Sequence, residues 1–507
     1  MVSGPNGSRV VRRLRLVRDR QRCRLAGLTL LPGLLVFFLT QAAQILGQTS
    51  GLAFFPYSSG TLGVYSTGGT LDTTSPFFQA LGTNSRSCDT CHKASDGYSI
   101  TPLHIQEQFD ATKGTDPLFR PNDGSNCADS PGVDESPPAK SAYSLLLNKG
   151  LIRFSLPIPA NSQFTATVVS DPYGCAANTD SSGQESLTVY RRVPPATNLR
   201  FLSNVMLDGR ESLKSLNDPA TFQSNLNFDL VHQALDATLG HEQATTPPTQ
   251  EQLQEIVDFE LGTYTAQQVD NDAGVLVAQG ADGGPIRLSA VPYYPGINDS
   301  LGSDPTGATF DPDAFMLFSS WEHLMSRNPY TLARESIARG ERIFNSAPMI
   351  IQDVKGLNDK LGTTTFVGTC STCHDAPDSG GHSLPSFFDI GITDIPADNN
   401  DPLLAALATL NTPYLPVYAL SCSTELGGPS DFTVETTDPG WAIVTGRCAD
   451  IGKVKVPVIR GLAARPPYFQ DGSADTLEQA VEFYNQRFQM GLTANELEDL
   501  VSFLKSL

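Results

Sequence analysis

Apolar residues recur at helical spacing in several parts of the chain. In residues 476–492 the stripe consists of Leu477, Val481, Tyr484 and Phe488. Positions three or four apart lie on one face of a helix, so this stretch is predicted to be an amphipathic helix against a core. Residues 331–346 and 493–507 carry similar stripes, and Thr493 with Glu496 predicts a capping box at the start of the last helix.

The first half of the chain combines helical stretches with β-branched ones. Residues 227–243 and 249–262 have helical periodicity. Runs of β-branched residues predict a β insertion at about 155–200. Residues 263–310 are polar and rich in Gly and Pro, which predicts loop. The fold class that we predict is therefore mainly α.

The first 47 residues differ from the rest. Arginines precede a short apolar run at residues 26–39, and small residues follow in TQAAQ. This order is typical of a secretory signal, and the run is short for a membrane span. Residues 1–47 are therefore predicted to be a Sec-type signal peptide that directs the chain to the periplasm. An uncleaved N-terminal anchor is the alternative.

The net charge of the chain indicates which classes of partner it can bind. The chain has a net charge of −20, and the leader holds eight arginines and one aspartate, so its removal makes the remainder still more acidic. A protein of this charge is expected to bind no nucleic acid and no anionic membrane surface. A small neutral substrate, or a redox partner with a basic face, fits better.

Two copies of one cysteine motif carry the clearest chemistry. They read Cys-x-x-Cys-His, at Cys88, Cys91 and His92 and at Cys370, Cys373 and His374. Two thiols at this spacing add to the vinyl groups of one haem, and the adjacent histidine reaches the iron. The chain is therefore predicted to hold two covalently bound haem c groups. Zinc, with half a site from each cysteine pair, is the alternative.

Four further cysteines are expected to form disulfides in an oxidising compartment. They are Cys127, Cys175, Cys422 and Cys448. Three pairings exist, and Cys127–Cys175 with Cys422–Cys448 is favoured because each bond then lies within one domain. Both bonds are interpreted as structural clips.

The two motifs also predict the domain organisation. Asn328-Pro329 precedes the helix that begins the second haem region and marks a boundary. We therefore predict two c-type cytochrome haem domains, at residues 48–328 and 329–507. The first is enlarged by the β insertion and by long loops.

The two motifs, LDGRES at 207–212 and VPVIRGLAARPPYFQDGSADTLEQAVEFYN at 456–485 resemble the bacterial di-haem cytochrome c peroxidase superfamily. This superfamily includes the enzyme that matures the quinone cofactor of methylamine dehydrogenase and the rubber-cleaving oxygenases. The resemblance is dense over about 331–507 and patchy over 85–262. It implies that the N-terminal haem meets peroxide or oxygen and that the C-terminal haem stores or passes an electron.

The resemblance also implies a Gln and a Glu on and just after the helix that follows DGR. In this chain the candidates are Gln233, His241 and Glu242. Such groups would move a proton between the peroxide oxygens and stabilise the leaving hydroxide. The plainer interpretations are a solvated helix residue for Gln233, a charge at a helix end for His241 and an exposed acid for Glu242.

Aligning AVEFYN with the family places Tyr484 at the position of the second haem's distal ligand. Methionine stands there in the classical peroxidases, and tyrosine in the quinone-maturation enzyme. A phenol oxygen is harder than a thioether and favours ferric iron, so a low-potential second haem is implied. Core packing of Tyr484 and ligation by Met490 are the alternatives.

The chain departs from the family at several positions. Leu207 stands where the family often has Trp between the haems, and Trp321 is either a replacement relay or a core residue. Arg465 replaces a threonine whose carbonyl helps to hold calcium, and its charge disfavours that ion. His104 is a candidate resting-state ligand of the first haem. His382 is expected to pack against the edge or a propionate of the second.

Two classes of function follow. The first is a periplasmic, cytochrome c peroxidase-like enzyme that reduces hydrogen peroxide at the N-terminal haem, with electrons relayed by the C-terminal haem from a small redox protein. A di-haem oxygenase or protein-oxidising enzyme of the same superfamily is a variant of this class. The second is a non-enzymatic di-haem electron carrier with both irons six-coordinate. The polar cluster after the DGR motif favours the enzyme, and nothing in the sequence indicates the oligomeric state.

Overall fold

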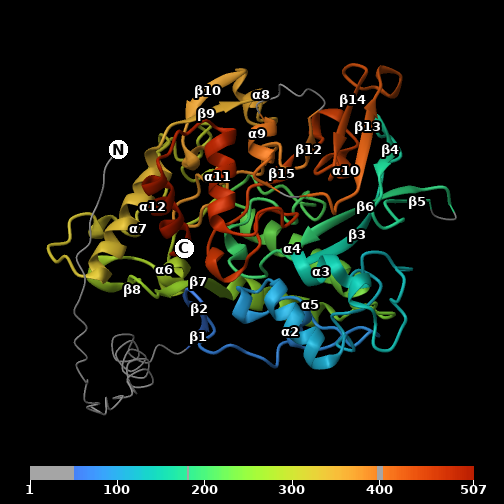
Figure 1. Ribbon diagram of the computed structural model, residues 1–507, viewed down its shortest axis with the longest axis horizontal. Coiled ribbons are helices and arrows are strands. Elements are labelled where there is room, and N and C mark those ends of the chain that lie inside the picture. Colours follow the sequence, from blue (N-terminus) through green and yellow to red (C-terminus); the bar gives the residue numbers. More distant parts are fainter. Residues whose placement is uncertain (1–50, 180–181, 397–402, 411) are drawn as a thin grey trace, which may run out of the picture. The chain divides into compact units, whose positions relative to one another are not determined.

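The computed structural model describes residues 51–179, 182–396, 403–410 and 412–507 (Figure 1). The predicted signal segment, residues 1–47, lies outside these ranges. No helix within them is both long enough and apolar enough to span a membrane. Ser50–Leu507 form one compact unit, and the division into haem domains at 48–328 and 329–507 remains a prediction.

The long helices of the second half pack together through the stripes that the sequence shows. They are α7 (Pro329–Ser346), α11 (Leu477–Arg487) and α12 (Ala494–Lys505). The Asn328 side chain accepts a hydrogen bond from the Thr331 N–H at the start of α7. Thr493 and Glu496 form the predicted capping box of α12. Trp321 is fully buried in the core that these helices share, which supports its interpretation as a core residue.

The helices of the first half lie where the periodicity predicts them, with small shifts at their ends. They are α2 (Pro102–Thr112), α3 (Ser144–Lys149), α4 (Phe222–Gly240) and α5 (Gln250–Gly262). Helix α4 begins before residue 227 because the apolar side chains of Phe222 and Leu226 continue its buried stripe. Thr249 and Gln252 form a capping box at the start of α5, and α5 packs against α4.

The remaining helices and the minor strands are short. The helices are α6 (Gly284–Ser289), α8 (Asn358–Leu361), α9 (Leu403–Leu407) and α10 (Ala442–Thr445). Two small antiparallel pairs consist of β9 (Met349–Gln352) with β10 (Thr365–Gly368) and of β11 (Phe387–Phe388) with β15 (Val454–Lys455).

The prediction of a mainly α fold is wrong. Only 32% of the residues are helical and 18% are in strands, which form several sheets. One four-stranded sheet has the order β1 (Leu52–Tyr57), β2 (Gly60–Ser66), β7 (Thr263–Asp270), β8 (Gly274–Val275). Strand β7 falls in the stretch that we expected to be loop. Its first six residues are all buried, so both faces are covered and the alternation that identifies a half-exposed strand is missing.

The predicted β insertion is present, and it joins the two halves of the chain. Strands β3 (Leu151–Pro157), β6 (Glu185–Arg192) and β5 (Ala177–Thr179) form one sheet. Strand β4 (Phe164–Ser170) instead pairs with β13 (Val417–Cys422), in a sheet that also holds β14 (Phe432–Thr436) and β12 (Asp394–Ile395). Figure 1 shows β4 beside β13 and β14, from the other end of the sequence. First-half and second-half residues therefore share a hydrophobic core here.

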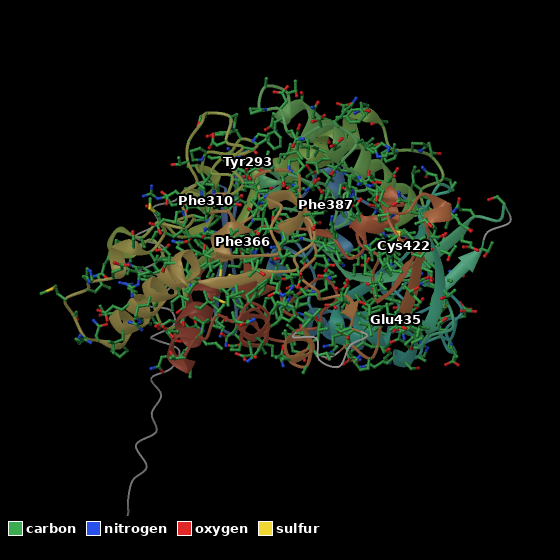
Figure 2. The ribbon with its side chains drawn as sticks, turned by 90° about the horizontal axis from the view of Figure 1, so that it is seen from above. Tyr293, Phe310, Phe366, Phe387, Cys422 and Glu435 are labelled. Carbon is green, nitrogen blue, oxygen red and sulfur yellow. A yellow bond between two sulfur atoms is a disulfide. The ribbon has the colours of Figure 1, made fainter. Side chains whose placement is uncertain are left out.

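Both predicted disulfides are confirmed. Cys127 bonds to Cys175, and Cys422 bonds to Cys448. Cys422 is the last residue of β13 and is labelled in Figure 2, together with Glu435 of the neighbouring strand β14. All four sulfur-bearing residues are buried, as expected for structural bonds.

Replacing Cys422 and Cys448 together by serine is expected to lower the free energy of unfolding by about 3 kcal/mol. The bond closes a loop with a sequence separation of 26, and its loss frees the unfolded chain. Urea unfolding followed by far-UV circular dichroism measures the change. An unchanged unfolding midpoint in non-reducing buffer would show that the bond contributes nothing to stability.

Candidate functional site

The two Cys-x-x-Cys-His motifs fold in the same way. Each begins with a 3₁₀ turn, Cys88–Thr90 in the first and Cys370–Thr372 in the second. Ser87 or Thr369 precedes the turn and forms a capping box with the threonine that ends it. The motif cysteines are half-buried and form no disulfide. The repeated local structure indicates the same role for both motifs.

A backbone carbonyl fixes the histidine of each motif. Nδ1 of His92 lies 2.8 Å from the carbonyl oxygen of Tyr98, and Nδ1 of His374 lies 2.5 Å from that of Gly380. A carbonyl oxygen only accepts, so Nδ1 carries the proton and donates, and the lone pair of Nε2 is left for a metal. Burial lowers the pKa of His92 to about 4 and also lowers the pKa of His374. Both rings are therefore neutral, which is the form that binds iron.

The geometry disfavours the zinc interpretation of the motifs. A zinc site built from both cysteine pairs needs the sulfurs of both pairs within bonding distance of one ion. Across the described ranges, the motif cysteines belong to neither group of candidate metal ligands whose donor atoms lie within 4.8 Å of one another.

A largely apolar cavity of about 330 Å³ lies against the second motif. Residues of that motif and both candidate distal ligands line it: Cys370, Cys373, His374, Tyr484 and Met490. Strands β3 and β6 supply walls from the first half of the chain, and α11 supplies a wall from the second. The volume is within the range of cofactor sites.

Half-buried cations line the same cavity. Burial lowers the pKa of Lys455 to about 8 and that of Arg465 to about 10. Burial and repulsion from Arg465 lower the pKa of Arg192 to about 9. Nε of Arg192 and Nε of Arg465 have no hydrogen-bond partner among the described residues. An apolar cavity with incompletely paired cations favours an apolar ligand with negative groups, and a haem with its two propionates fits this description.

Tyr484 lies in the cavity close to the second motif. Its ring stacks on Phe488, with centroids 5.9 Å apart, and it packs in the same cluster as Cys370 and Cys373. Burial raises the pKa of Tyr484 above its ordinary value, and nearby motif thiols add to the shift. Met490 lines the cavity from beyond the end of α11. Both candidate ligands therefore face one space.

His241 lies beside the first motif, where a buried ion pair orients it. Its Nδ1 donates to Oδ2 of Asp123 at 2.5 Å, and Asp123 also pairs with Arg86. Burial raises the pKa of Asp123, but His241 and Arg86 outweigh burial, so the net shift is downward and Asp123 is a carboxylate at neutral pH. The next residue, Glu242, lies 3.9 Å from Sγ of Cys88, which brings this segment to the first motif. Nε2 of His241 is the nitrogen left to move a proton.

Glu242 is buried, not exposed, and lies beside the first motif. One carboxylate oxygen accepts from the Leu81 N–H at 2.8 Å, and the other lies 3.9 Å from Sγ of Cys88. Burial raises the pKa of Glu242. Gln233 is half-buried on α4. The structure thus brings His241 and Glu242 to the first motif, while the role of Gln233 stays a prediction.

Phe154 on β3 connects the regions of the two motifs. Its ring lines the cavity beside the second motif and meets the ring of His241 edge to face, with centroids 5.7 Å apart. It also packs against the cluster that includes Cys91 of the first motif. The guanidinium of Arg210, from the LDGRES segment, lies 5.3 Å from the Phe154 ring centroid. One aromatic side chain therefore contacts both functional regions.

Sequence reasoning missed four of these residues: Arg86, Asp123, Phe154 and Arg192. Asp123 lies in a Gly- and Pro-containing loop where no pattern singles out one acid. The pair Arg191-Arg192 is different, since two arginines inside the apolar run TVYRRV of a predicted strand are a sign of buried charge.

The other singled-out residues have ordinary contacts. His104 on α2 hydrogen-bonds Asp96 through Nδ1. His382 is buried but is not among the residues that line the cavity. The carbonyl of Arg465 accepts a hydrogen bond from Arg192 at 2.8 Å. A guanidinium thus lies at the carbonyl on which the implied calcium site depends, which disfavours that ion.

Comparisons with known proteins agree with the haem-binding interpretation of the two motifs. No family model matches the chain. Cytochrome c551 peroxidase of Nitrosomonas europaea is 46% identical over 77 residues, which is 14% of this chain and 23% of that protein. Cytochrome-c peroxidase IdrP2 of Denitromonas iodatirespirans is 31% identical over 150 residues, 28% of this chain and 37% of that protein. IdrP1 of a Pseudomonas species is 22% identical over 236 residues, 44% of this chain and 55% of that protein.

The matched segments thus span from about a quarter to about half of the length of these relatives. A solved structure described as a MauG-like protein associated with microbial copper homeostasis aligns over 85% of this chain and 87% of its own, with 12% identity. Its TM-score of 0.31 is too low to support an argument. The similarity to proteins named cytochrome c peroxidases supports the resemblance to the di-haem peroxidase superfamily that the two motifs indicate.

Proposed function

We propose that this chain is a di-haem c-type oxidoreductase that reduces hydrogen peroxide. The reaction takes two electrons and two protons for each H₂O₂ and yields two waters. The observation that carries the proposal is the repeated motif geometry: each histidine donates from Nδ1 to a carbonyl and keeps Nε2 for iron.

The residues present fit two haem c groups. Cys88 and Cys91 at the first motif, and Cys370 and Cys373 at the second, supply the thioether bonds. The cavity cations described above would hold the propionates of the second group. When bound, the haem groups supply the redox chemistry, one as the site of peroxide reduction and one as an electron store.

The polar groups beside the first motif handle protons. His241 takes a proton from one peroxide oxygen at Nε2 and returns it to the leaving oxygen. Asp123 holds the ring in the tautomer that makes this transfer feasible, and Arg86 fixes Asp123. Glu242 has its pKa raised by burial and provides a second proton-bearing group near Cys88.

We propose that Phe154 provides a contact for electron transfer between the regions of the two haem motifs. It contacts His241 on one side and lines the cavity of the second motif on the other. Trp321 does not replace the family tryptophan at Leu207, because it is buried in the core of α7 and α12, while Leu207 itself lines the cavity. Electrons are therefore proposed to pass from the second motif to the first across this aromatic contact.

Tyr484→Phe is expected to change the optical and EPR spectra of the second haem. The phenol lies in the cavity beside Cys370 and Cys373, and its oxygen is the hard ligand that favours ferric iron. Loss of this ligand is expected to raise the reduction potential by on the order of 100 mV. A spectroelectrochemical titration measures the shift.

Met490→Leu is the matched control, because Met490 lines the same cavity. It is expected to leave the spectrum and the potential unchanged. If the spectrum changes in Met490→Leu and not in Tyr484→Phe, the thioether of Met490 is the ligand. The tyrosine ligand that resembles the quinone-maturation branch would then be excluded.

The location and the donor belong to the same proposal. Covalent haem attachment by these motifs follows export, which agrees with a periplasmic enzyme that carries a signal segment at residues 1–47. The net charge of −20 suits a small redox protein with a basic face as the donor. Peroxide-dependent oxidation of such a reduced donor tests the proposal, and no oxidation above the haem-free background would favour the electron-carrier alternative.

A further inference from the structure

A third cluster of metal-ligating side chains is buried outside the cavity. It consists of Asp299, Asp375 and His382, whose donor atoms all lie within 4.8 Å of one another. Each of the three residues is at most 1% exposed. Asp375 directly follows the second motif, while Asp299 comes from a separate loop. None of the three lines the cavity described above, so the cluster is not part of the proposed haem pocket.

The donor atoms of this cluster are incompletely paired. Neither ring nitrogen of His382 makes a hydrogen bond, and Oδ1 of Asp299 has no partner. Nε2 of His382 lies 4.0 Å from that oxygen. The Nζ of Lys360, a cation on which Asp299 acts electrostatically, donates to Ser386 instead. Two carboxylates that are this deeply buried need a compensating cation.

A hydrogen bond between His382 and Asp375 does not account for this arrangement. An imidazole N–H donates along the N–H direction. Nδ1 of His382 lies 2.9 Å from Oδ2 of Asp375, yet this contact lacks the geometry of a hydrogen bond. Two ligands of one metal ion can lie this close without hydrogen-bond alignment, because the donor atom of each points at the ion and not at the other ligand.

Backbone groups hold the two carboxylates in place. The Ser383 N–H donates to Oδ1 of Asp375 at 2.7 Å, and the Ser303 N–H donates to Oδ2 of Asp299 at 2.7 Å. Tyr293, labelled in Figure 2, donates from its hydroxyl to the Ser383 carbonyl at 3.4 Å. Metal-ligating carboxylates are commonly oriented by such outer hydrogen bonds, and Oδ1 of Asp299 is left without one.

We propose that Asp299, Asp375 and His382 bind one divalent first-row transition-metal ion. One imidazole nitrogen and two carboxylate oxygens suit Zn²⁺, Mn²⁺ or Fe²⁺, whereas Ca²⁺ requires six to eight oxygens. The ion neutralises the buried carboxylates and joins the loop of Asp299 to the segment that follows the second motif. Such ions lie about 2.0–2.2 Å from their ligands, so loading draws the donor atoms together.

Metal analysis of the purified holoprotein tests this site. Chelator-treated protein is incubated with Zn²⁺ or Mn²⁺, freed of excess metal and analysed by plasma mass spectrometry, with haem iron subtracted from total iron. About one non-haem metal ion per chain is expected in the wild type, and at least a tenfold lower content in Asp299→Asn and His382→Gln. The measurement does not depend on peroxide turnover, so it stands apart from the proposed function.

The trio Glu211, His232 and Asp236, in which only Asp236 is exposed, provides the matched control, because it offers the same types of ligand within the same distance. His232→Gln is expected to retain the metal. Calorimetric titration of the wild type with Zn²⁺ covers the case in which a variant of the buried cluster fails to fold. Less than about 0.1 ion per chain in the loaded wild type, or loss of the ion in His232→Gln, would overturn the proposal.

Discussion

Replacing Cys370 and Cys373 by serine is expected to lower the covalently bound haem from two groups per chain to one. Serine hydroxyls form no thioether with the vinyl groups, so the second haem is no longer attached. The first motif, with its own turn and its own histidine clamp, keeps its haem. Peroxide turnover with an external donor is expected to disappear with the electron store. Pyridine haemochrome analysis combined with intact-protein mass measures the haem count.

The disulfide variant is the control for this experiment. Serine at Cys422 and Cys448 removes two buried sulfurs as well, but these belong to no haem motif, so two haem groups are expected to remain. A wild-type protein that holds zinc and no haem would contradict the assignment of both motifs. So would a Cys370→Ser, Cys373→Ser variant that retains two covalent haem groups.

His241→Gln is expected to lower kcat/KM for hydrogen peroxide by about 10²- to 10⁴-fold, the range of a lost general acid–base group. Glutamine keeps a polar side chain at the site but has no nitrogen that exchanges a proton at neutral pH. The loss is expected mainly in the chemical step, because the haem and its proximal histidine are untouched. Steady-state kinetics with a reduced donor, alongside the optical spectrum, measures it.

Two further variants sharpen the result. His232 lies on α4, which ends just before His241, and its ring contacts Glu211. The turnover of His232→Gln is therefore expected to equal that of the wild type. Asp123→Asn acts through the orientation of His241 and is expected to change the pH profile as well as the rate. Equal turnover in His241→Gln and the wild type would remove His241 from the mechanism.

The helices of this fold are largely predictable from sequence, and the sheets are only partly so. Helices α7, α11 and α12 are predictable from their apolar stripes and caps. A helix that buries one face has apolar residues every three or four positions, and this spacing is visible within a single stretch of sequence. Strand β7 has six consecutive buried residues and shows no alternation. The pairing of β4 with β13 joins segments that are far apart in the chain. A local sequence pattern does not identify a partner strand at such a distance.

The candidate site divides in the same way. The haem motifs are predictable because the two cysteines that attach a haem and the histidine that binds its iron lie within one short segment. The orientation of His241 is not, because it depends on Asp123 and Arg86, which come from other segments and meet only in the folded chain. The half-buried guanidinium groups of Arg192 and Arg465 likewise meet only when the β insertion packs against the second half.

EPR spectroscopy of the oxidised holoprotein before and after one equivalent of hydrogen peroxide distinguishes a peroxide-reducing enzyme from an electron carrier. We expect one high-spin ferric signal from the first haem, with an open coordination position, and one low-spin signal from the second. Adding peroxide is expected to remove the high-spin signal. Two low-spin signals that peroxide leaves unchanged would contradict a peroxide-reducing enzyme and would identify the chain as an electron carrier.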